Sequence, residues 1–119
     1  MLKKVAFTYY PVKDMPAARA FYEGSLGLTS RNPSTSPWVE YDLPGGGCFA
    51  ITTVTPEQPS SSAGGTIAFE VDDLDGVADN LKAKGVKFAS DMIHSPVCRM
   101  MVCLDPEGNS ILLHQLKPK

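Results

Sequence analysis

Few side chains in this chain do acid–base, nucleophilic or metal chemistry near neutral pH. The 119 residues include two histidines, His94 and His114, and three cysteines. None of the cysteines stands in a CxxC spacing, so we expect free thiols in a reducing cytoplasm, each a small buried apolar residue. His94 belongs to a predicted loop, whereas His114 lies in a run that suits a strand. His114 is therefore the best candidate for a general base or a hydrogen-bond donor.

Composition and charge argue against several kinds of partner. The chain has 13 acidic and 11 basic residues, a formal net charge of −2 and no cluster of Lys and Arg, so we expect no nucleic-acid partner. No apolar run approaches the roughly 20 residues that span a bilayer, and residues 1–5 lack the apolar core of a signal peptide. These observations predict a cytoplasmic protein with no membrane partner.

Helix caps and turn residues divide the chain into elements. Asp14 and Asp73 stand where helix N-caps belong, which predicts one helix that ends near Gly24 or Gly27 and a second over 74–84. The segment Asp105-Pro106-Glu107-Gly108 predicts a tight turn that closes the last hairpin. Residues 90–97 are predicted to form a loop. We expect strands over residues 4–12, 28–30, 38–42, 48–54, 66–71, 86–89, 98–104 and 110–116.

The two halves of the chain repeat one pattern. Val12-x-Asp14-Met15 matches Val71-x-Asp73-Leu74, at an offset of 59 residues. Each half is predicted to be a βαβββ module whose helix covers one sheet face, so the second face must meet something else. The predicted fold class is α+β, with two tandem modules forming a curved mixed sheet around a concave cleft and helices outside. We expect residues 1–119 to be a single domain, with module one over about 1–55, a linker over about 55–65 and module two over about 66–117.

Three segments resemble the vicinal oxygen chelate superfamily, which includes glyoxalase I, bleomycin-resistance proteins and extradiol dioxygenases. They are VKDMPAARAFYEGSLGL at 12–28, IAFEVDDL at 67–74 and DPEGN at 105–109. The resemblance covers nearly the whole chain and implies the fold described above. It does not select an activity, because the superfamily spans lyases, isomerases, dioxygenases and non-catalytic drug-binding proteins. It also implies a homodimer, since members commonly pair.

The resemblance implies where a metal would lie. In the metalloenzymes of the superfamily, His and Glu at four inward-facing strand positions hold one divalent ion. The corresponding residues of this chain offer almost no ligand atoms, whereas a catalytic metal needs about three N, O or S ligands. We therefore expect no metal at that place and no other cofactor. The four positions fall on Phe7, Ala50, Thr66 and Leu112.

Side chains alternate between the two faces of a strand, which predicts what lines the cleft. The predicted lining is apolar and aromatic with a few polar groups, and it suits a flat or amphipathic organic molecule. The alternative is that the large side chains fill the space between the halves. The predicted ligand-binding residues are Phe7, Tyr9, Trp38, Ala50, Thr52, Thr66, Arg99 and Leu112.

His114 and Glu70 are the predicted catalytic residues if the protein is an enzyme. His114 lies two residues beyond Leu112 on the same face, and Glu70 belongs to a neighbouring inward-facing set. The alternatives are a histidine satisfied at a strand end and a solvated glutamate. Likewise, Arg99 either binds an anionic ligand or is a surface arginine, and Trp38 either lines the cleft or belongs to the core.

The leading hypothesis is a metal-independent small-molecule-binding protein of the glyoxalase/bleomycin-resistance type. The alternative is a lyase or isomerase, most similar to lactoylglutathione lyase, that uses a divalent metal or acid–base chemistry by His and Glu. A third hypothesis is a structural or protein-interaction role with the cleft filled by the protein's own side chains.

Overall fold

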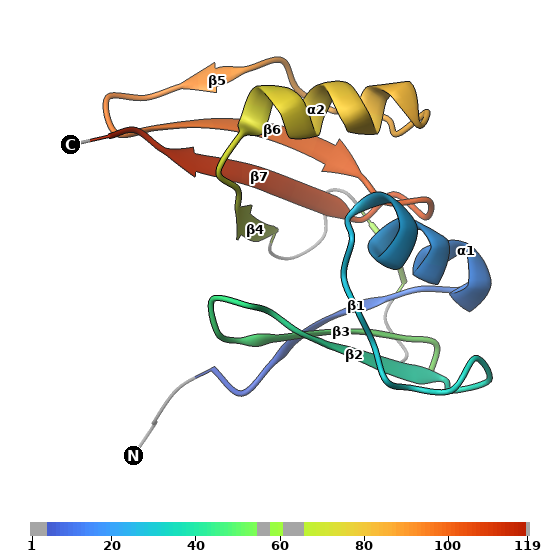
Figure 1. Ribbon diagram of the computed structural model, residues 1–119. Helices are drawn as coiled ribbons and strands as arrows, with labels where there is room; N and C mark the ends of the chain where they lie inside the picture. Colours follow the sequence, from blue (N-terminus) through green and yellow to red (C-terminus); the bar gives the residue numbers. More distant parts are fainter. Residues whose placement is uncertain (1–4, 55–57, 61–65, 119) are drawn as a thin grey trace. The chain divides into compact units, whose positions relative to one another are not determined.

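The structure of the protein, a computed structural model, describes residues 5–54, 58–60 and 66–118 (Figure 1). The chain divides into two compact units, Met1–Pro59 and Ser60–Lys119. Each unit combines one sheet with helix, so the predicted α+β class and the two-module organisation are confirmed. Most of the predicted linker lies outside the described residues. No helix in the described part is long and apolar enough to cross a membrane.

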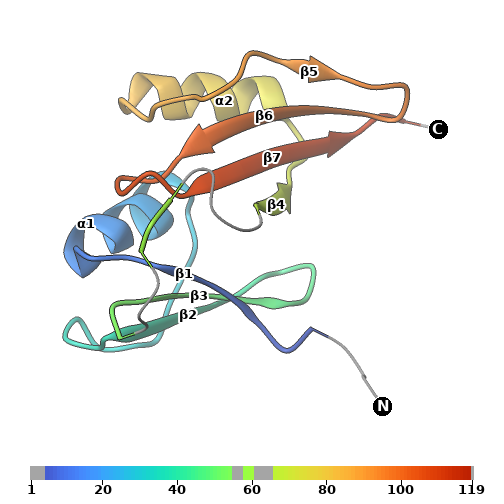
Figure 2. The ribbon, with the colours of Figure 1, turned by 180° about the vertical axis from the view of Figure 1, so that it is seen from behind.

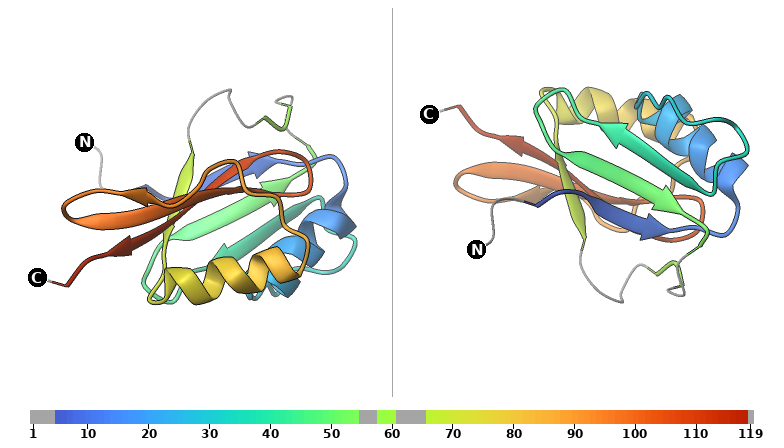
Figure 3. Two further views of the ribbon diagram at one scale, coloured as in Figure 1. Left: turned by 90° about the horizontal axis from the view of Figure 1, so that it is seen from above. Right: turned by 90° about the horizontal axis from the view of Figure 1, so that it is seen from below.

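Unit 1 contains a three-stranded sheet in the order β1-β3-β2 (Figure 3). β1 runs parallel to β3, and β2 runs antiparallel to it. The helical segment between β1 and β2 begins as an α-helix and continues as a π-helix, η1. The elements are β1 (Thr8–Pro11), α1 (Met15–Arg19), η1 (Ala20–Ser25), β2 (Trp38–Asp42) and β3 (Cys48–Thr52).

The start of α1 follows the sequence signal. Asp14 Oδ1 accepts a hydrogen bond from the backbone N of Ala17 at 3.1 Å, which confirms the predicted N-cap. The π-helix at the other end was not predicted. Its final turn is closed by the backbone N of Leu26, which donates to Phe21 O at 2.9 Å, and Gly27 then leaves the helix with φ +76°.

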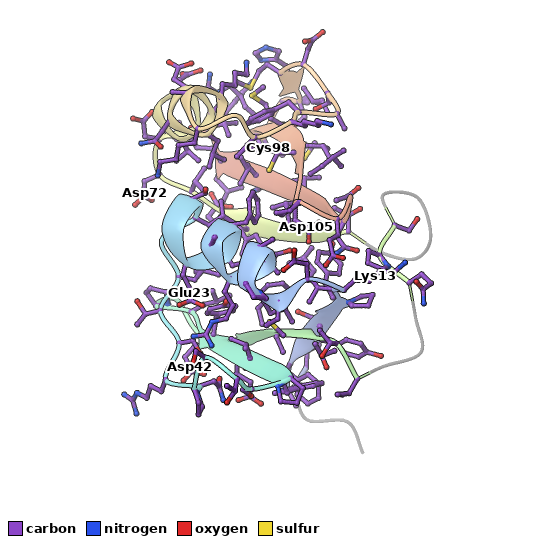
Figure 4. The ribbon with its side chains drawn as sticks, turned by 90° about the vertical axis from the view of Figure 1, so that its right-hand side faces the viewer. Lys13, Glu23, Asp42, Asp72, Cys98 and Asp105 are labelled. Atoms are coloured by element: carbon purple, nitrogen blue, oxygen red, sulfur yellow. The ribbon has the colours of Figure 1, made fainter. Side chains whose placement is uncertain are left out.

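Helix residues pack against one face of the unit 1 sheet. The ring centroid of Tyr22 lies 6.2 Å from that of Tyr41 and 5.1 Å from that of Phe49, and all three side chains are buried. The hydroxyl of Tyr41 donates to Glu23 Oε2 at 3.0 Å, and Figure 4 shows Glu23 between the helical segment and β2. Arg19 Nε donates to the same carboxylate at 2.6 Å and lowers the pKa of Glu23. This face of the sheet therefore forms part of the core of unit 1.

One predicted strand of unit 1 is not formed. Residues 28–30 have no strand partner, because the backbone N of Leu28 donates to Tyr22 O at the end of the helix. Ser30 then bonds Asn32 through its side chain, which turns the chain. The unit is βαββ, so the prediction of βαβββ was wrong for this half. β1 and β3 are also shorter than the predicted strands over 4–12 and 48–54.

Unit 2 contains a four-stranded sheet in the order β4-β7-β6-β5 (Figure 2). β4 runs parallel to β7, and the other neighbours are antiparallel. Its element order is βαβββ, as predicted. The elements are β4 (Ile67–Glu70), α2 (Leu74–Ala83), β5 (Ile93–His94), β6 (Cys98–Leu104) and β7 (Ser110–Leu116).

The helix of unit 2 is bounded by the predicted residues. Asp73 Oδ1 accepts a hydrogen bond from Gly76 N at 3.1 Å, and Gly85 follows the helix with φ +82°. Leu74 and Leu81 of α2 are fully buried. They form the core of the unit with the buried residues of β6 and β7 on the helix-facing side, which are Met101, Cys103, Ile111 and Leu113.

The predicted strand over 86–89 is reduced to a single bridge between Phe88 and Cys103. The hydrogen-bonded strand next to β6 lies later, at β5, inside the predicted loop 90–97. The closing hairpin, in contrast, has the predicted bounds. Asp105 Oδ1 in its turn accepts hydrogen bonds from the backbone N of Glu107 and of Asn109, both at 2.9 Å.

Candidate functional site

The helix-free face of the unit 1 sheet carries three aromatic rings close to one another. In register, Tyr9 lies beside Ala50, which lies beside Glu40, and Trp38 precedes Glu40 by two residues on the same face. The ring centroid of Trp38 lies 5.5 Å from that of Phe7, with an interplanar angle of 89°, and 5.8 Å from that of Tyr9. We call Phe7, Tyr9 and Trp38 the aromatic cluster. The structure thus brings together three of the predicted ligand-binding residues.

The aromatic cluster lies at the surface. Phe7 is 45% exposed, and Tyr9 and Trp38 are partly exposed. Glu40 Oε1 accepts a hydrogen bond from Trp38 Nε1 at 2.9 Å, which fixes the orientation of the indole. Sequence reasoning missed Glu40, although alternation from Trp38 along β2 places both residues on one face.

Two residues predicted to contact a ligand are buried. Ala50 and Thr52 each have 0% of their surface exposed. Thr52 Oγ1 donates to Pro37 O at 3.1 Å and accepts a hydrogen bond from Val54 N at 3.1 Å. Neither residue offers surface to a ligand in this structure, and Thr52 serves instead to fasten the ends of β2 and β3.

The corresponding face of the unit 2 sheet carries a carboxylate–imidazole pair. Glu70 and His114 are register partners on β4 and β7, and Glu70 Oε1 lies 2.5 Å from His114 Nδ1. Glu70 Oε2 accepts a hydrogen bond from the backbone N of Leu116 at 2.9 Å. The contact with His114, followed by the Leu116 amide, lowers the pKa of Glu70. The two predicted catalytic residues are therefore in direct contact.

An apolar row lies next to this pair. Ala68, Leu112 and Val102 are neighbours in register on β4, β7 and β6, and all three are at least partly exposed. Met100 is the neighbour of His114 on β6, so apolar groups border the imidazole on two sides. Thr66 lies just before β4 and is exposed.

Arg99 does not belong to this face. Its Nη2 donates to Asp75 Oδ2 at 3.0 Å and to Gln115 Oε1 at 3.1 Å, and Asp75 lies on α2. The side chain is therefore on the helix side of the sheet, opposite Glu70 and His114. Residue 99 has the opposite parity to Met100 on β6, so Arg99 does not join the other predicted residues of this unit, and its binding of an anionic ligand stays a prediction.

Comparison with known proteins identifies the family. The family model of the Glyoxalase/Bleomycin resistance protein/Dioxygenase superfamily matches residues 4–113. The chain belongs to this superfamily. The predicted resemblance is thereby confirmed over nearly the whole sequence, while no curated protein matches the chain.

Solved structures from the superfamily share the fold at low sequence identity. A glyoxalase/dioxygenase from Nostoc punctiforme is 19% identical with a TM-score of 0.81, over 98% of this chain and 92% of that one. TnmS3, an antibiotic binding protein from Streptomyces sp. CB03234, is 24% identical with a TM-score of 0.80, over 98% of both chains. A superfamily member from Sphaerobacter thermophilus DSM 20745 is 22% identical with a TM-score of 0.77, over 97% of this chain and 99% of that one. At these identities the likeness shows the fold alone.

The residues present do not fit the divalent metal of the superfamily's metalloenzymes. At the four positions that the resemblance implies for ligands, Phe7, Ala50 and Leu112 have no ligand atom in their side chains, and Thr66 has a single hydroxyl. Within the described residues, no group of three or more His, Cys, Asp or Glu side chains is placed to hold a metal ion. The nearest ligating side chains on the same face of unit 2 are Glu70 and His114, which bond each other.

Proposed function

We propose that this protein binds a small apolar or aromatic organic molecule without a metal ion. The observation that carries the proposal is the exposed aromatic cluster on the helix-free face of the unit 1 sheet. Aromatic side chains that gather at a surface mark a place where a ligand or partner binds. The apolar row on the helix-free face of unit 2 supports the same kind of ligand.

The superfamily includes proteins with this kind of role. TnmS3 is an antibiotic binding protein with the same fold. A shared fold does not transfer a ligand, so the proposal rests on the side chains of this chain. We also propose that the protein is cytoplasmic and forms a homodimer. Light scattering of the purified protein tests the dimer, because one chain has a mass of 12.8 kDa.

The test uses Trp38, the single tryptophan of the chain. Neutral aromatic compounds are screened by thermal shift, and hits are titrated by tryptophan fluorescence. We expect Phe7→Ser to weaken binding about tenfold, since an aromatic contact is worth about 0.5–1.5 kcal/mol beyond its area. Val5→Ser is the matched control, because Val5 is apolar, exposed and close in sequence. If Phe7→Ser binds as the parent does, the aromatic cluster is not the site.

The Glu70–His114 contact favours a second candidate function, a lyase or isomerase that moves a proton. A carboxylate on Nδ1 orients the imidazole so that Nε2 faces outward as a base, as in other His–carboxylate pairs. If this candidate holds, His114→Ala abolishes activity on a glyoxalase-type substrate. Activity that survives in His114→Ala would eliminate this role.

A further inference from the structure

The strands of the unit 1 sheet carry negative charge and no positive charge. Their sequences are TYYP, WVEYD and CFAIT, so Glu40 and Asp42 are their only charged residues. Both follow Trp38 at intervals of two and therefore share its face. This is the face that carries the aromatic cluster.

The negative charges of Glu40 and Asp42 affect the thiol of Cys48 on the neighbouring strand β3. Cys48 is the register partner of Asp42. Burial and then the charges of Glu40 and Asp42 raise the pKa of the Cys48 thiol. Burial disfavours a charge of either sign, but the two carboxylates that oppose a thiolate on this face favour a cation.

The aromatic rings supply the second half of a cation site. The faces of Trp, Tyr and Phe rings carry negative charge density and attract a cation within about 6 Å of the ring centroid. Phe7 and Trp38 make an edge-to-face contact, with centroids 5.5 Å apart and an interplanar angle of 89°, so ring faces of the cluster lie within reach of a ligand beside Glu40. Tyr9 adds a third ring at 45° to the indole.

Glu40 is fixed beside these rings. Its Oε1 is held by Trp38 Nε1. The side chain of Glu40 is exposed at the surface of the sheet. A carboxylate next to aromatic faces is the combination that recognises quaternary ammonium and protonated amine groups.

We propose that the aromatic cluster and Glu40 bind an organic cation, a quaternary ammonium or protonated amine attached to an apolar or aromatic body. This inference rests on the proposed function and names its ligand class. An anionic ligand is excluded from the same position, because it would meet Glu40 and Asp42 with no Lys or Arg on the three strands.

The experiment compares three probes of similar shape and different charge. Benzyltrimethylammonium is the cation, neopentylbenzene its neutral isostere and benzylsulfonate an anion. Each is titrated into the full chain at low salt while Trp38 fluorescence is recorded. We expect the cation to bind about five- to tenfold more tightly than the neutral isostere, and the anion not to bind.

Two variants separate charge from shape. Glu40→Gln keeps an acceptor for Trp38 Nε1 but removes the charge, so it should reduce the preference for the cation to less than twofold and leave the neutral probe unchanged. Asp79→Asn is the matched control, because Asp79 is an exposed acidic residue of α2 in unit 2, and it should leave all three affinities unchanged.

The outcomes separate this inference from the proposed function. Equal binding of the cation and the neutral isostere would overturn the cation site while the proposed function stands. A cation preference that persists in Glu40→Gln would overturn the role of Glu40. Failure of all three probes, together with failure of the neutral aromatic screen, would overturn both proposals.

Discussion

The Glu70 carboxylate is held in its ionised form by groups from β7. His114 Nδ1 and the backbone N of Leu116 both reach it, and together they lower its pKa. The ionised form therefore stabilises the fold above the unfolded pKa of about 4.3. This stabilisation is lost as the pH falls through the lower folded value. Because the carboxylate is exposed, the effect is small.

This linkage predicts a pH-dependent effect of Glu70→Gln. The urea midpoint of the variant should be lower than that of the parent at pH 7, and the difference should shrink below pH 4. Equilibrium unfolding at several pH values measures it. In the background of His114→Ala the Glu70→Gln effect should decrease, since the two residues are coupled. A midpoint difference that stays constant from pH 7 to pH 3 would contradict the role assigned to this carboxylate.

At the scale of elements, the turn between β6 and β7 explains why DPEGN is a family signature. Asp105 is buried and accepts hydrogen bonds from Glu107 N, Asn109 N and, at 2.8 Å, Asn109 Nδ2. Asn109 Oδ1 in turn accepts a hydrogen bond from the backbone N of Ser60 at 3.1 Å. The motif therefore stabilises the turn between β6 and β7 and connects it to Ser60.

We predict that Asp105→Ala destabilises the protein by about 3 kcal/mol, because it leaves buried donors without acceptors. Asp105→Asn should cost less, because its amide oxygen retains the backbone donors. Denaturant unfolding of both variants checks the order. If Asp105→Ala were no less stable than Asp105→Asn, the turn network would not be a source of stability.

Two glycines at helical segments should respond to alanine with opposite signs. Gly85 follows α2 with φ +82°, so Gly85→Ala should cost roughly 1–2 kcal/mol. Gly24 lies inside η1, and a methyl group there meets nothing within 4 Å, so Gly24→Ala should stabilise by about 0.5–1 kcal/mol. Thermal unfolding of the two variants measures the contrast, and destabilisation by Gly24→Ala would show that the π-helical turn needs glycine.

Residue types near one another in sequence predicted the elements whose hydrogen bonds are local, namely the helix starts and the last hairpin. The caps at Asp14 and Asp73 and the hairpin of β6 and β7 followed from residue types at fixed offsets. Strand alternation also predicted that Glu70 and His114 share a face.

Where structure and prediction differ, the contacts involved are ones that local residue patterns do not determine. Residues 28–30 suit a strand, but the amide of Leu28 bonds the helix end instead. Arg99 was assigned to the site by residue type, and its pairing with Asp75 on α2 is a tertiary contact. The burial of Ala50 and Thr52 depends on packing that alternation does not predict.

At the scale of the whole molecule, the two units repeat one sequence pattern but carry different side chains on the helix-free faces of their sheets. The helix-free face of unit 1 carries aromatic rings and carboxylates, whereas that of unit 2 carries an apolar row and the Glu70–His114 pair. The four positions that the resemblance implies for metal ligands contribute one hydroxyl between them. We therefore propose that these faces bind an organic ligand by contact area and not by metal coordination.

The most direct test of metal-independent binding is a titration of the protein with a neutral aromatic hit, recorded by Trp38 fluorescence. The samples are chelator-treated protein and protein incubated with nickel, zinc, manganese or ferrous iron. Metal content of each sample is measured in parallel. We predict the same dissociation constant in every sample and no stoichiometric metal. Binding that appears only after one metal is incorporated at one ion per chain would contradict the account and favour a metalloenzyme.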